Sequence, residues 1–550
     1  MNKFNKNFHL NMSPMYAVFF FMLFMLWASE AKANDVEEVI VVAQQENTIK
    51  TDPVTSSSLM SAIMPAFTWN AGGYGGFIGY NERGAQTSHT SVIVNGIPAN
   101  DPGAGWYDFG HDFVNGQTVK VVSGANGVLY GSGSIAGTIL IQDTIERGIT
   151  LRVEDGVNYA RVAPIDQLEF SVVSDSMGSV RSDNNEEDNY ENKTARFNVD
   201  AGKFNIVGKF TEYDYDYDNC FDDQFQSTNN CLQSGVRYNI ATRSDNITIG
   251  RNYVESDYFS DTVLNYTNKS YTDFVRFSNE KILSDKVYIF YGVDADQRSY
   301  ETQHFSHNDE NYGAFFTANV RMLVDLNIGI RQGNDNQNAV RVGAELGNWF
   351  FNVGNSFRKP TLYEKFGDEF VDGNKALASE EGIGYELGFG VLSAFKFDFK
   401  ETIEYVDGFY IGELWVPPTY QNTGSYTTEG IRFANVFGPF AVNLKYTKSD
   451  QPRVPKYMGM LSWQDNFFNT NFRIKYAFSL DRKPSAFDII PQDKLFLDDL
   501  HKVNFYITKK LNNGITLGFK AENITNEQVE VLPFYPVEGR EMYLTLDYKW

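Results

Sequence analysis

The sequence lacks long apolar runs and an excess of basic residues. Beyond the first thirty residues no segment is long and apolar enough to form a lipid-soluble helix, and the mean hydropathy is −0.36. The chain has 47 Lys and Arg against 70 Asp and Glu, a formal net charge of −23. Nucleic-acid binding requires a positively charged surface that follows the phosphates. We therefore exclude nucleic acid as a partner.

The sequence also lacks the short motifs of common catalytic sites. It contains no G-x-S-x-G, no H-E-x-x-H and no G-x-x-x-x-G-K-(S/T) segment. The glycine-rich run at 131–137 does not have the G-x-G-x-x-G spacing of a dinucleotide site. We expect no enzymatic activity and no nucleotide cofactor, so energy for any active process must come from outside the chain.

Residues 1–33 have the features of a secretory signal peptide. Two lysines precede an apolar run at 16–28, and an A-x-A cleavage signal follows at 31–33. A run of this length spans only ~20 Å as a helix, whereas the hydrocarbon core is about 30 Å thick. A membrane anchor is therefore disfavoured, and we expect the mature, exported chain to begin at Asn34.

From about residue 148 to the end, the sequence repeats an alternating segment followed by a turn. In 287–296, one face would carry Val287, Ile289, Tyr291, Val293 and Ala295, and the other Tyr288, Phe290, Gly292, Asp294 and Asp296. In 395–400, three phenylalanines alternate with Lys396, Asp398 and Lys400. This period of two is typical of β-strands with one face toward lipid. Short turns such as Asn512-Asn513-Gly514 alternate with long polar connections such as 212–235, as in outer-membrane barrels. About 18 residues per strand and connection predict roughly 22 antiparallel strands.

Two further regions fit an all-β transmembrane barrel with a domain inside it. The chain ends on an alternating strand whose last residue is Trp550, and outer-membrane proteins as a class present such a strand to the assembly machinery. Residues 34–147 instead contain glycine-rich runs at 71–76 and 130–137 between short apolar strands. Because glycine permits close backbone approach, we expect a compact α+β domain packed in the barrel lumen.

Four ordered motifs in this region resemble the plug domain of TonB-dependent receptors. They correspond to the family's R-G, V-L-(D/N)-G-(V/I)-P, R-G-P and L-Y-G-S segments, with Ser123-Gly124-Ala125 in place of Arg-Gly-Pro. The matching positions, as the resemblance implies them, are Arg83, Gly84, Asn95, Gly96, Asp101, Pro102, Tyr130, Gly131, Ser132, Gly133 and Gly137.

The segment after the cleavage site resembles a TonB box, which adds as a strand to the energy-coupling protein of the periplasm. It comprises Glu37, Glu38, Val39, Ile40, Val41, Val42 and Ala43. Extended β-branched residues suit strand addition, because main-chain hydrogen bonds supply the affinity. An ordinary first strand is the alternative. Since no domain separates this segment from the leader, we expect no role in transcriptional signalling.

Segments of the barrel region are also similar to this family. They are 356–364, 373–377, 381–387, 420–430 and 521–525, whereas 150–350 is supported by alternation alone. After the signal peptide at 1–33, the resemblance implies a TonB box and linker at 34–56, a plug at 57–147 and a transmembrane barrel at 148–550.

The resemblance further implies TonB-dependent uptake of a scarce bulky solute, a ferric siderophore or a cobalamin-like ligand, across the outer membrane. The partners would be a TonB-type protein, the solute and outer-membrane lipids. The alternative is a passive porin-like or structural barrel with a vestigial plug.

One connection is both acidic and cysteine-containing. Export would allow Cys220 and Cys231 to form a disulfide, contributing ~3 kcal/mol on the chain-entropy model. Carboxylates suit Ca²⁺, which takes six to eight oxygens, and some cobalamin-type receptors order such loops with calcium. The alternative is a solvated acidic loop. The calcium ligands would be Asp214, Asp216, Asp218, Asp222 and Asp223. His304 and His307 lie in another polar segment and by themselves do not complete a metal site.

Overall fold

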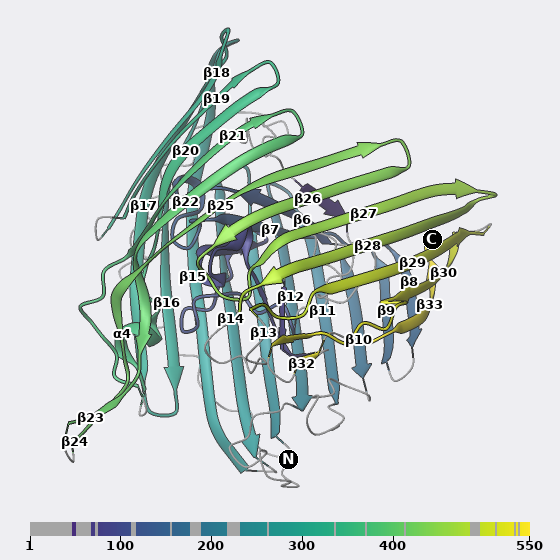
Figure 1. Cartoon of the computed structure of the whole chain (residues 1–550), viewed down its shortest axis with the longest axis horizontal. Coiled ribbons are helices and arrows are strands. Elements are labelled where there is room, and N and C mark those ends of the chain that lie inside the picture. Colours follow the sequence, from purple (N-terminus) through teal and green to yellow (C-terminus); the bar gives the residue numbers. More distant parts are fainter. Residues whose placement is uncertain are drawn as a thin grey trace. The chain divides into compact units, whose positions relative to one another are not determined.

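The alternating segments after residue 147 form a closed antiparallel barrel in the computed structural model (Figure 1). It has 22 strands, which confirms the predicted number. Each strand pairs with its neighbours along the chain, and β33 (Glu541–Tyr548) pairs with β8 (Gly148–Glu154) to close the ring. Closure removes the two edges of an open sheet, whose unpaired backbone groups would be costly in lipid.

The structure describes most of the barrel and much of the N-terminal domain. Among the described residues, no helix has both the length and the apolar character needed to cross a membrane. The described residues are 47–50, 68–71, 75–111, 117–154, 157–175, 189–216, 231–260, 263–334, 337–368, 371–411, 414–484, 495–511, 514–532, 535–536 and 539–550.

The barrel strands differ widely in length. β15 has 22 residues, about twice the ~9 to 11 that a tilted strand needs to cross the hydrocarbon, so it extends well beyond that zone. The remaining barrel strands are β9 (Val157–Ile165), β10 (Leu168–Asp175), β11 (Tyr190–Ala201), β12 (Phe204–Asp216), β13 (Cys231–Arg243), β14 (Ile247–Ser260), β15 (Val263–Ser284), β16 (Val287–Thr302), β17 (Ser306–Val320), β18 (Asp325–Gly333), β19 (Asn338–Leu346), β20 (Trp349–Arg358), β21 (Glu380–Phe389), β22 (Leu392–Val406), β25 (Thr419–Phe437), β26 (Phe440–Ser449), β27 (Pro455–Phe467), β28 (Thr470–Arg482), β29 (Leu500–Lys510) and β30 (Ile515–Glu522).

Connections between barrel strands alternate between short turns and longer segments. In the β19–β20 turn, Gly347 has φ +60°, a left-handed conformation that favours glycine. The longer segments contain α4 (Leu362–Phe366), the hairpin β23 (Phe409–Ile411)–β24 (Leu414–Val416), and the pair β31 (Glu530–Leu532)–β32 (Tyr535–Pro536). In Figure 1, α4 and β23–β24 lie at the lower left, opposite the tips of the β25–β26 and β27–β28 hairpins. The end of the barrel that carries α4 and β23–β24 is called the long-loop end here. The end that carries the tips of the β25–β26 and β27–β28 hairpins is called the short-turn end.

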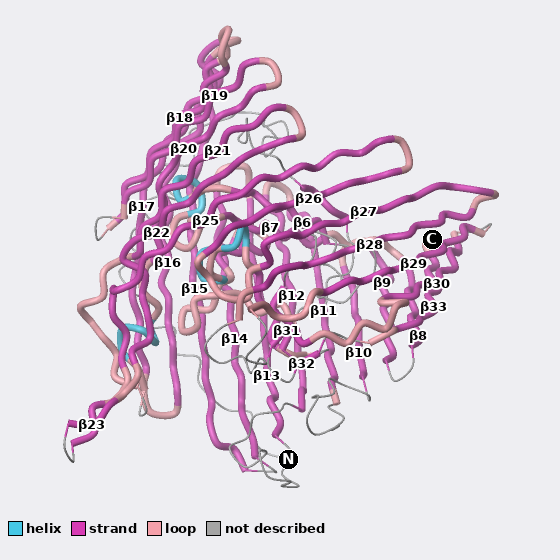
Figure 2. Tube along the Cα trace, in the orientation of Figure 1, coloured by secondary structure: helices cyan, strands magenta, loops and turns pink. Residues whose placement is uncertain are grey.

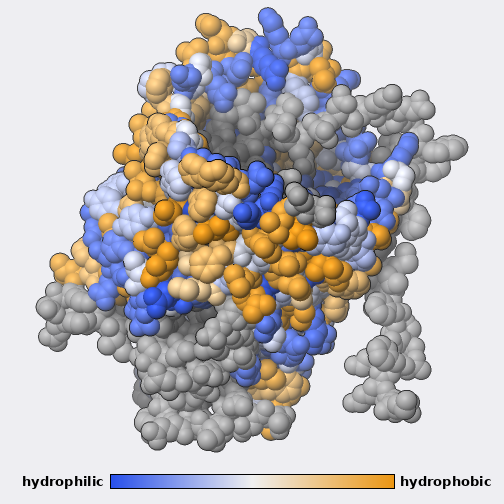
Figure 3. Space-filling model, turned by 90° about the vertical axis from the view of Figure 1, so that its right-hand side faces the viewer, coloured by the Kyte–Doolittle hydropathy of each residue, from blue (hydrophilic) through white to orange (hydrophobic). Residues whose placement is uncertain are grey.

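The outer face of the barrel is apolar and the inner face is mainly polar. On β8, Leu151 and Val153 are 44% and 60% exposed, whereas Thr150 and Arg152 are buried. On β16, Val293 faces outward and Asp294 is buried. Figure 3 shows hydrophobic residues gathered on the side of the molecule that it presents. This is the face that a strand crossing a bilayer turns toward lipid.

Strand β22 is an exception, because its apolar face points into the lumen. Phe395, Phe397 and Phe399 are buried in one cluster with Ala85, Ile135 and Ala136 of the inner domain. Alternation alone predicts that this strand has one apolar and one polar face. It does not identify which of them is internal, because an apolar face can be covered either by lipid or by the inner domain.

The inner domain has the predicted α+β character. Its sheet has the order β1-β6-β7-β4-β5, in which β4 (Thr90–Val94) and β7 (Gly137–Asp143) are parallel. Figure 2 shows its short helices enclosed by the strands of the barrel. The other elements are β1 (Asn47–Lys50), β2 (Thr68–Ala71), β3 (Phe77–Tyr80), β5 (Ile97–Pro98), β6 (Gln117–Ser123), η2 (Glu82–Gly84), η3 (Thr87–His89) and α3 (Gly127–Tyr130).

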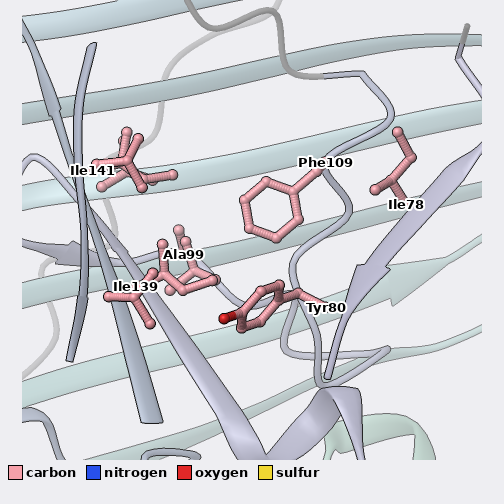
Figure 4. Packing of buried hydrophobic residues seen from close by; sticks show 10 residues of the cluster. Ile78, Tyr80, Ala99, Phe109, Ile139 and Ile141 are labelled. Carbon is pink, nitrogen blue, oxygen red and sulfur yellow. The ribbon is translucent and has the colours of Figure 1, made fainter. Parts of the chain in front are cut away.

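The inner domain has its own core and also packs against the barrel. Ile78, Tyr80 and Phe109 face Ile139 and Ile141 of the sheet (Figure 4). A second cluster joins Ile97 of β5 to Val207, Ala241 and Phe274 of the barrel wall. The inner domain therefore occupies the lumen as a plug.

Candidate functional site

The predicted R-G motif lies where the plug meets strand β21. Arg83 has φ 52° inside the 3₁₀ turn η2, and its Nη2 donates to Glu386 Oε1 at 2.6 Å. Both side chains are almost completely buried, and the guanidinium also lies 4.8 Å from the ring centroid of Phe395. A buried charge is stable only when it is paired and hydrogen-bonded, so this contact fixes the turn against the barrel.

Glu82 anchors the same turn within the plug. Its carboxylate accepts hydrogen bonds from the Tyr80 hydroxyl and the Ser123 hydroxyl, each at 2.7 Å. Burial alone would raise the pKa of this carboxyl, but the Lys445 and Arg83 cations and the two hydrogen bonds outweigh it, so the pKa lies below its ordinary value. Glu82 is therefore held as a carboxylate.

Two predicted glycines permit this close packing. Gly84 has φ +76°, and its carbonyl accepts a hydrogen bond from Ser449 of β26 at 2.8 Å. A Cβ at Gly137, the first residue of β7, would lie 2.9 Å from Cγ of Glu82. Larger residues at either position would therefore push the turn away from its partners.

A second buried network starts from His89, a residue that the sequence did not single out. Its Nε2 and a Glu380 carboxylate oxygen lie 2.8 Å apart, and its Nδ1 lies 2.6 Å from the Tyr426 hydroxyl. The imidazole also stacks on Phe399, with ring centroids 4.9 Å apart. Plug and barrel are thus joined through both ring nitrogens.

The His89 network continues into the long-loop end. Arg358 at the end of β20 pairs with Glu380 and donates to Glu364 at 3.0 Å. Glu364 and Thr361 form a capping box, in which Glu364 N donates to Thr361 Oγ1 at 3.0 Å. The plug is therefore linked through Arg358 to helix α4. The T-x-x-E spacing at 361–364 is the local signal that could have identified this cap.

The predicted pair Asn95 and Gly96 forms the tight turn between β4 and β5. Both have positive φ, 53° and 87°, the combination that a type I′ turn requires. Asn95 Nδ2 donates to Asp143 at 2.7 Å, and Arg196 of β11 pairs with the same carboxylate at 3.2 Å. This turn therefore contributes to a second charged contact between plug and barrel.

Asp101 and Pro102 form the apex of the plug at the long-loop end. Asp101 Oδ1 accepts from the backbone N–H groups of Gly103 and Ala104 at 2.6 and 2.9 Å, and from the Ser270 hydroxyl at 3.0 Å. The Pro102 carbonyl accepts from Leu362 N of α4 at 2.9 Å. The apex is thereby fixed directly beneath a long connection.

The predicted segment 130–133 follows helix α3 and contacts strand β20. Gly131 and Gly133 have φ 72° and 84°. Gly133 N donates to the Phe357 carbonyl at 2.9 Å, and Lys359 N donates to Ser132 Oγ at 2.9 Å. Tyr130 is the last residue of α3. The R-G, N-G, D-P and S-G segments, well separated in sequence, thus each contact the barrel.

A buried aromatic pocket surrounds His111. Its ring stacks on Tyr213 of β12 with centroids 3.8 Å apart. Burial, with a smaller contribution from the Arg237 cation, holds the pKa of His111 well below its usual value. Burial likewise raises the pKa of the neighbouring Tyr107 to about 12. His111 is therefore a neutral packing group.

The proposed calcium ligands are only partly described. Asp214 and Asp216 end β12 and alternate with the inward-facing Tyr213 and Tyr215, so they face away from the lumen. Asp214 accepts from the Ser234 hydroxyl at 2.6 Å, and Asp216 accepts from Asn189 Nδ2 at 2.9 Å. The calcium site, the TonB box at 37–43 and the disulfide stay predictions. Outside the described residues lie Asp218, Cys220, Asp222, Asp223 and the segment 37–43, and the side chain of Cys231 is not described.

His304 and His307 do not form a metal centre with other described groups. Among the described residues, no cluster of three or more His, Cys, Asp or Glu side chains is arranged to hold a metal ion. His307 instead stacks on Phe366 of α4, with ring centroids 4.0 Å apart.

Comparisons with known proteins match both regions of the chain. Residues 32–138 match the TonB-dependent receptor plug domain, and residues 140–524 match the TonB-dependent receptor-like β-barrel. The vitamin B12 transporter BtuB of Vibrio cholerae is 21% identical over 586 residues, covering 95% of this chain and 94% of that protein.

Solved structures share the fold at low sequence identity. A mutant of the ferric enterobactin receptor PfeA from Pseudomonas aeruginosa, in complex with enterobactin, has a TM-score of 0.68 at 13% identity, covering 92% of this chain and 100% of that chain. The copper transporter OprC has a TM-score of 0.67 at 13% identity, covering 92% and 98%. The siderophore receptor PirA from Acinetobacter baumannii has a TM-score of 0.65 at 13% identity, covering 92% and 98%.

Proposed function

Because the chain belongs to the TonB-dependent receptor family, we propose that it actively takes up a scarce, bulky solute. A transmembrane barrel of this family indicates the outer membrane, and the family's members are transporters and receptors. Outer-membrane barrels have long loops on the exterior side and short turns on the periplasmic side. The long-loop end therefore faces the exterior, and the short-turn end faces the periplasm.

The observation that carries the proposal is the buried, ion-paired contact between plug and barrel. Arg83 with Glu386 and Arg196 with Asp143 each form an ion pair between a plug residue and a barrel residue. His89 and Glu380 add a buried hydrogen-bonded contact between the two parts. Separating one partner from a buried ion pair costs about 3 to 5 kcal/mol. A plug held in this way requires an external input of energy to move, which favours active uptake over passive flow.

The proposed mechanism has three steps. A solute binds at the long-loop end, over the apex at Asp101 and Pro102. The segment 37–43 then adds as a strand to a TonB-type protein in the periplasm, which draws on the proton-motive force. The pull displaces the plug from its charged contacts and opens a path along the lumen.

Two of the solute classes named for the similar proteins are bulky. BtuB is a vitamin B12 transporter, PfeA is a ferric enterobactin receptor and PirA is a siderophore receptor. We propose a ferric siderophore or a cobalamin-like ligand, and we retain calcium at the β12–β13 connection as a proposed aid to binding. Outer-membrane lipids would contact the apolar outer face.

Uptake should be measured in cells that carry this chain as their only receptor, with and without the coupling protein. Labelled cobalamin and labelled ferric siderophores serve as the solutes. We expect uptake of one of them, and we expect it to be lost without the coupling protein although surface binding remains. Undiminished uptake without that protein would instead support the alternative, a passive barrel with a vestigial plug.

A further inference from the structure

A small cavity lies between the R-G turn of the plug and the barrel strands β19 to β21. On the plug side it is lined by Arg83, Gly124 and Ala125. On the barrel side, Arg341 of β19 and Glu386 of β21 are among its lining residues. The cavity and its opening enclose about 260 Å³, whereas pockets for drug-sized ligands enclose about 300 to 1,000 Å³. This space suits a small ion or a few water molecules rather than a bulky solute.

The two arginines that line the cavity are almost completely buried, at 3% exposure for Arg83 and 5% for Arg341. Arg83 donates to Glu386 through Nη2, and Arg341 donates to Asn126 Oδ1 through Nη1 at 3.3 Å. Within the described part of the chain, Arg83 Nη1 and Arg341 Nη2 are buried without a hydrogen-bond partner. Because buried donors of charged groups are costly to leave unpaired, these two nitrogens require an acceptor at the cavity.

The cavity also has fewer carboxylates than guanidiniums. The carboxylate that acts electrostatically on Arg341 is Glu386, and the same carboxylate already accepts the hydrogen bond from Arg83. One negative charge is therefore shared by two buried positive charges. The protein groups at the cavity leave it positively charged.

Two further cations lie beside this cluster. Arg432 of β25 and Lys445 of β26 are directly opposite each other, an arrangement in which like charges repel. Both act electrostatically on Glu82, and the Lys445 ammonium has no hydrogen-bond partner among the described residues. The cluster thus contains four cations and two carboxylates, none more than 7% exposed: Arg83, Arg341, Arg432, Lys445, Glu82 and Glu386.

We propose that the cavity binds one small monovalent anion, of the size of chloride, between the guanidiniums of Arg83 and Arg341. The anion accepts hydrogen bonds from their two remaining terminal nitrogens, and charge-assisted hydrogen bonds of this kind are the strong ones. It also offsets part of the surplus positive charge, because a buried charge is stable only when it is paired. Glu386 disfavours a multiply charged anion, because it already places a negative charge at the cavity.

The bound anion joins the plug to the barrel, because Arg83 belongs to the plug and Arg341 to β19. A ligand that binds only the folded chain stabilises it by mass action, and unfolding separates the two arginines. The folded chain is therefore more stable in chloride than in an anion that does not bind. This inference does not rest on the proposed uptake function, since it concerns only how the plug is seated.

Anomalous diffraction from crystals of the full-length chain soaked in bromide tests the site directly. Bromide is close to chloride in size and charge, and it scatters anomalously at its absorption edge. We expect one bromide peak between the guanidiniums of Arg83 and Arg341. Ordered water at this place without bromide would overturn the proposal.

Thermal unfolding of the purified full-length chain in neutral detergent tests binding in solution. Sodium chloride is exchanged stepwise for sodium gluconate at constant ionic strength, so that screening is the same throughout. Gluconate carries the same charge on a much larger body. We expect the unfolding midpoint to rise with chloride and to reach a plateau, as for a single saturable site. Equal midpoints at every ratio of the two salts would overturn the proposal.

Arg341→Met tests whether this cavity is the site, because it removes one guanidinium and keeps a long side chain. The variant should lose the bromide peak and should unfold at the same temperature in both salts. The control is Arg251→Met, because Arg251 pairs with Asp273 on β14 and β15 and its side chain is 39% exposed. The control should keep both the peak and the dependence on chloride.

Heat-dependent mobility of the barrel on a denaturing gel shows whether each variant is folded. A folded Arg341→Met protein that keeps the dependence on chloride would contradict the assignment of the site. If Arg341→Met does not fold, the bromide and salt measurements on the parent decide the question. None of these measurements involves the coupling protein, so their outcome is independent of the uptake experiment in cells.

Discussion

At the residue scale, the buried charges of the plug have partners on the barrel. Arg83 meets Glu386, and Asp143 meets Arg196. Such pairs contribute less to net stability than to a defined register, because each ion must first lose its water. Their distribution over β11 and β21 holds the plug at separate points on the wall and so fixes its position in the lumen.

Glu386→Gln should strongly destabilise the seated plug. The substitution removes one charge of a buried pair and leaves the Arg83 guanidinium without its counter-charge, at a cost of about 3 to 5 kcal/mol. The measurement is the midpoint of guanidinium-induced unfolding. The matched control is Glu429→Gln, whose partner Lys448 is mostly solvent-exposed, and this variant should unfold like the parent. Equal midpoints for all three proteins would contradict the role assigned to Glu386.

His111 should make the stability of the plug depend on pH. Its pKa in the folded chain is well below the ordinary value, so unfolding takes up a proton once the pH falls below about 6.5, the pKa of a free histidine. The contribution of His111 is therefore fully present above that pH and is lost as the pH falls toward the depressed folded value. The unfolding midpoint of the parent should decrease between pH 7.5 and pH 5.5.

His111→Phe isolates that effect, because a phenyl ring can keep the stack on Tyr213 but does not titrate. The variant should lose less stability than the parent over the same pH range. An identical pH dependence in the two proteins would assign the slope to groups other than His111.

Sequence reasoning identified residues whose constraint is local, but not their partners. Asn95-Gly96 and Arg83-Gly84 were identifiable because tight turns and left-handed backbone restrict residue type. His89 was missed because its partners Glu380 and Tyr426 are about 300 residues away. A polar residue facing a lumen has the same sequence pattern as one facing water, so alternation does not predict which side chains pair.

At the element scale, helix α4 connects the long-loop end of the barrel to the plug. Glu364 pairs with Arg358, and Arg358 pairs with Glu380, the hydrogen-bond partner of His89. A ligand that shifts α4 would therefore alter a contact that holds the plug. Glu364, Arg358, Glu380 and His89 are brought together by the fold, because they come from the β20–β21 connection, β20, β21 and the plug.

The β12–β13 connection is the element in which calcium binding is predicted. Changing Asp214, Asp216 and Asp218 to Asn should abolish a calcium-binding heat in calorimetric titration of the purified chain, because each change removes an anionic oxygen. Reduction of Cys220 and Cys231 should weaken the same heat, because a loop released from a disulfide loses more entropy on ordering. Equal heats in parent and variant would contradict calcium binding here and favour the alternative, a solvated acidic loop.

At the scale of the whole molecule, strand number was predictable because it follows from the repeat length of strand and connection. The direction in which the apolar face of β22 points was not predictable, because its three phenylalanines turn toward the plug and not toward lipid.

The central claim is that energy from a periplasmic partner, delivered through residues 37–43, drives uptake. The most direct measurement compares Ile40→Pro with Ile40→Ala in cells whose only receptor is this chain, recording surface binding and uptake of the same labelled solute. Proline removes a backbone donor and fixes φ, which prevents strand addition, whereas alanine retains the main-chain hydrogen bonds. The account predicts that Ile40→Pro abolishes uptake with binding intact and that Ile40→Ala retains both. Uptake that persists in Ile40→Pro, or binding that falls together with uptake, would contradict it.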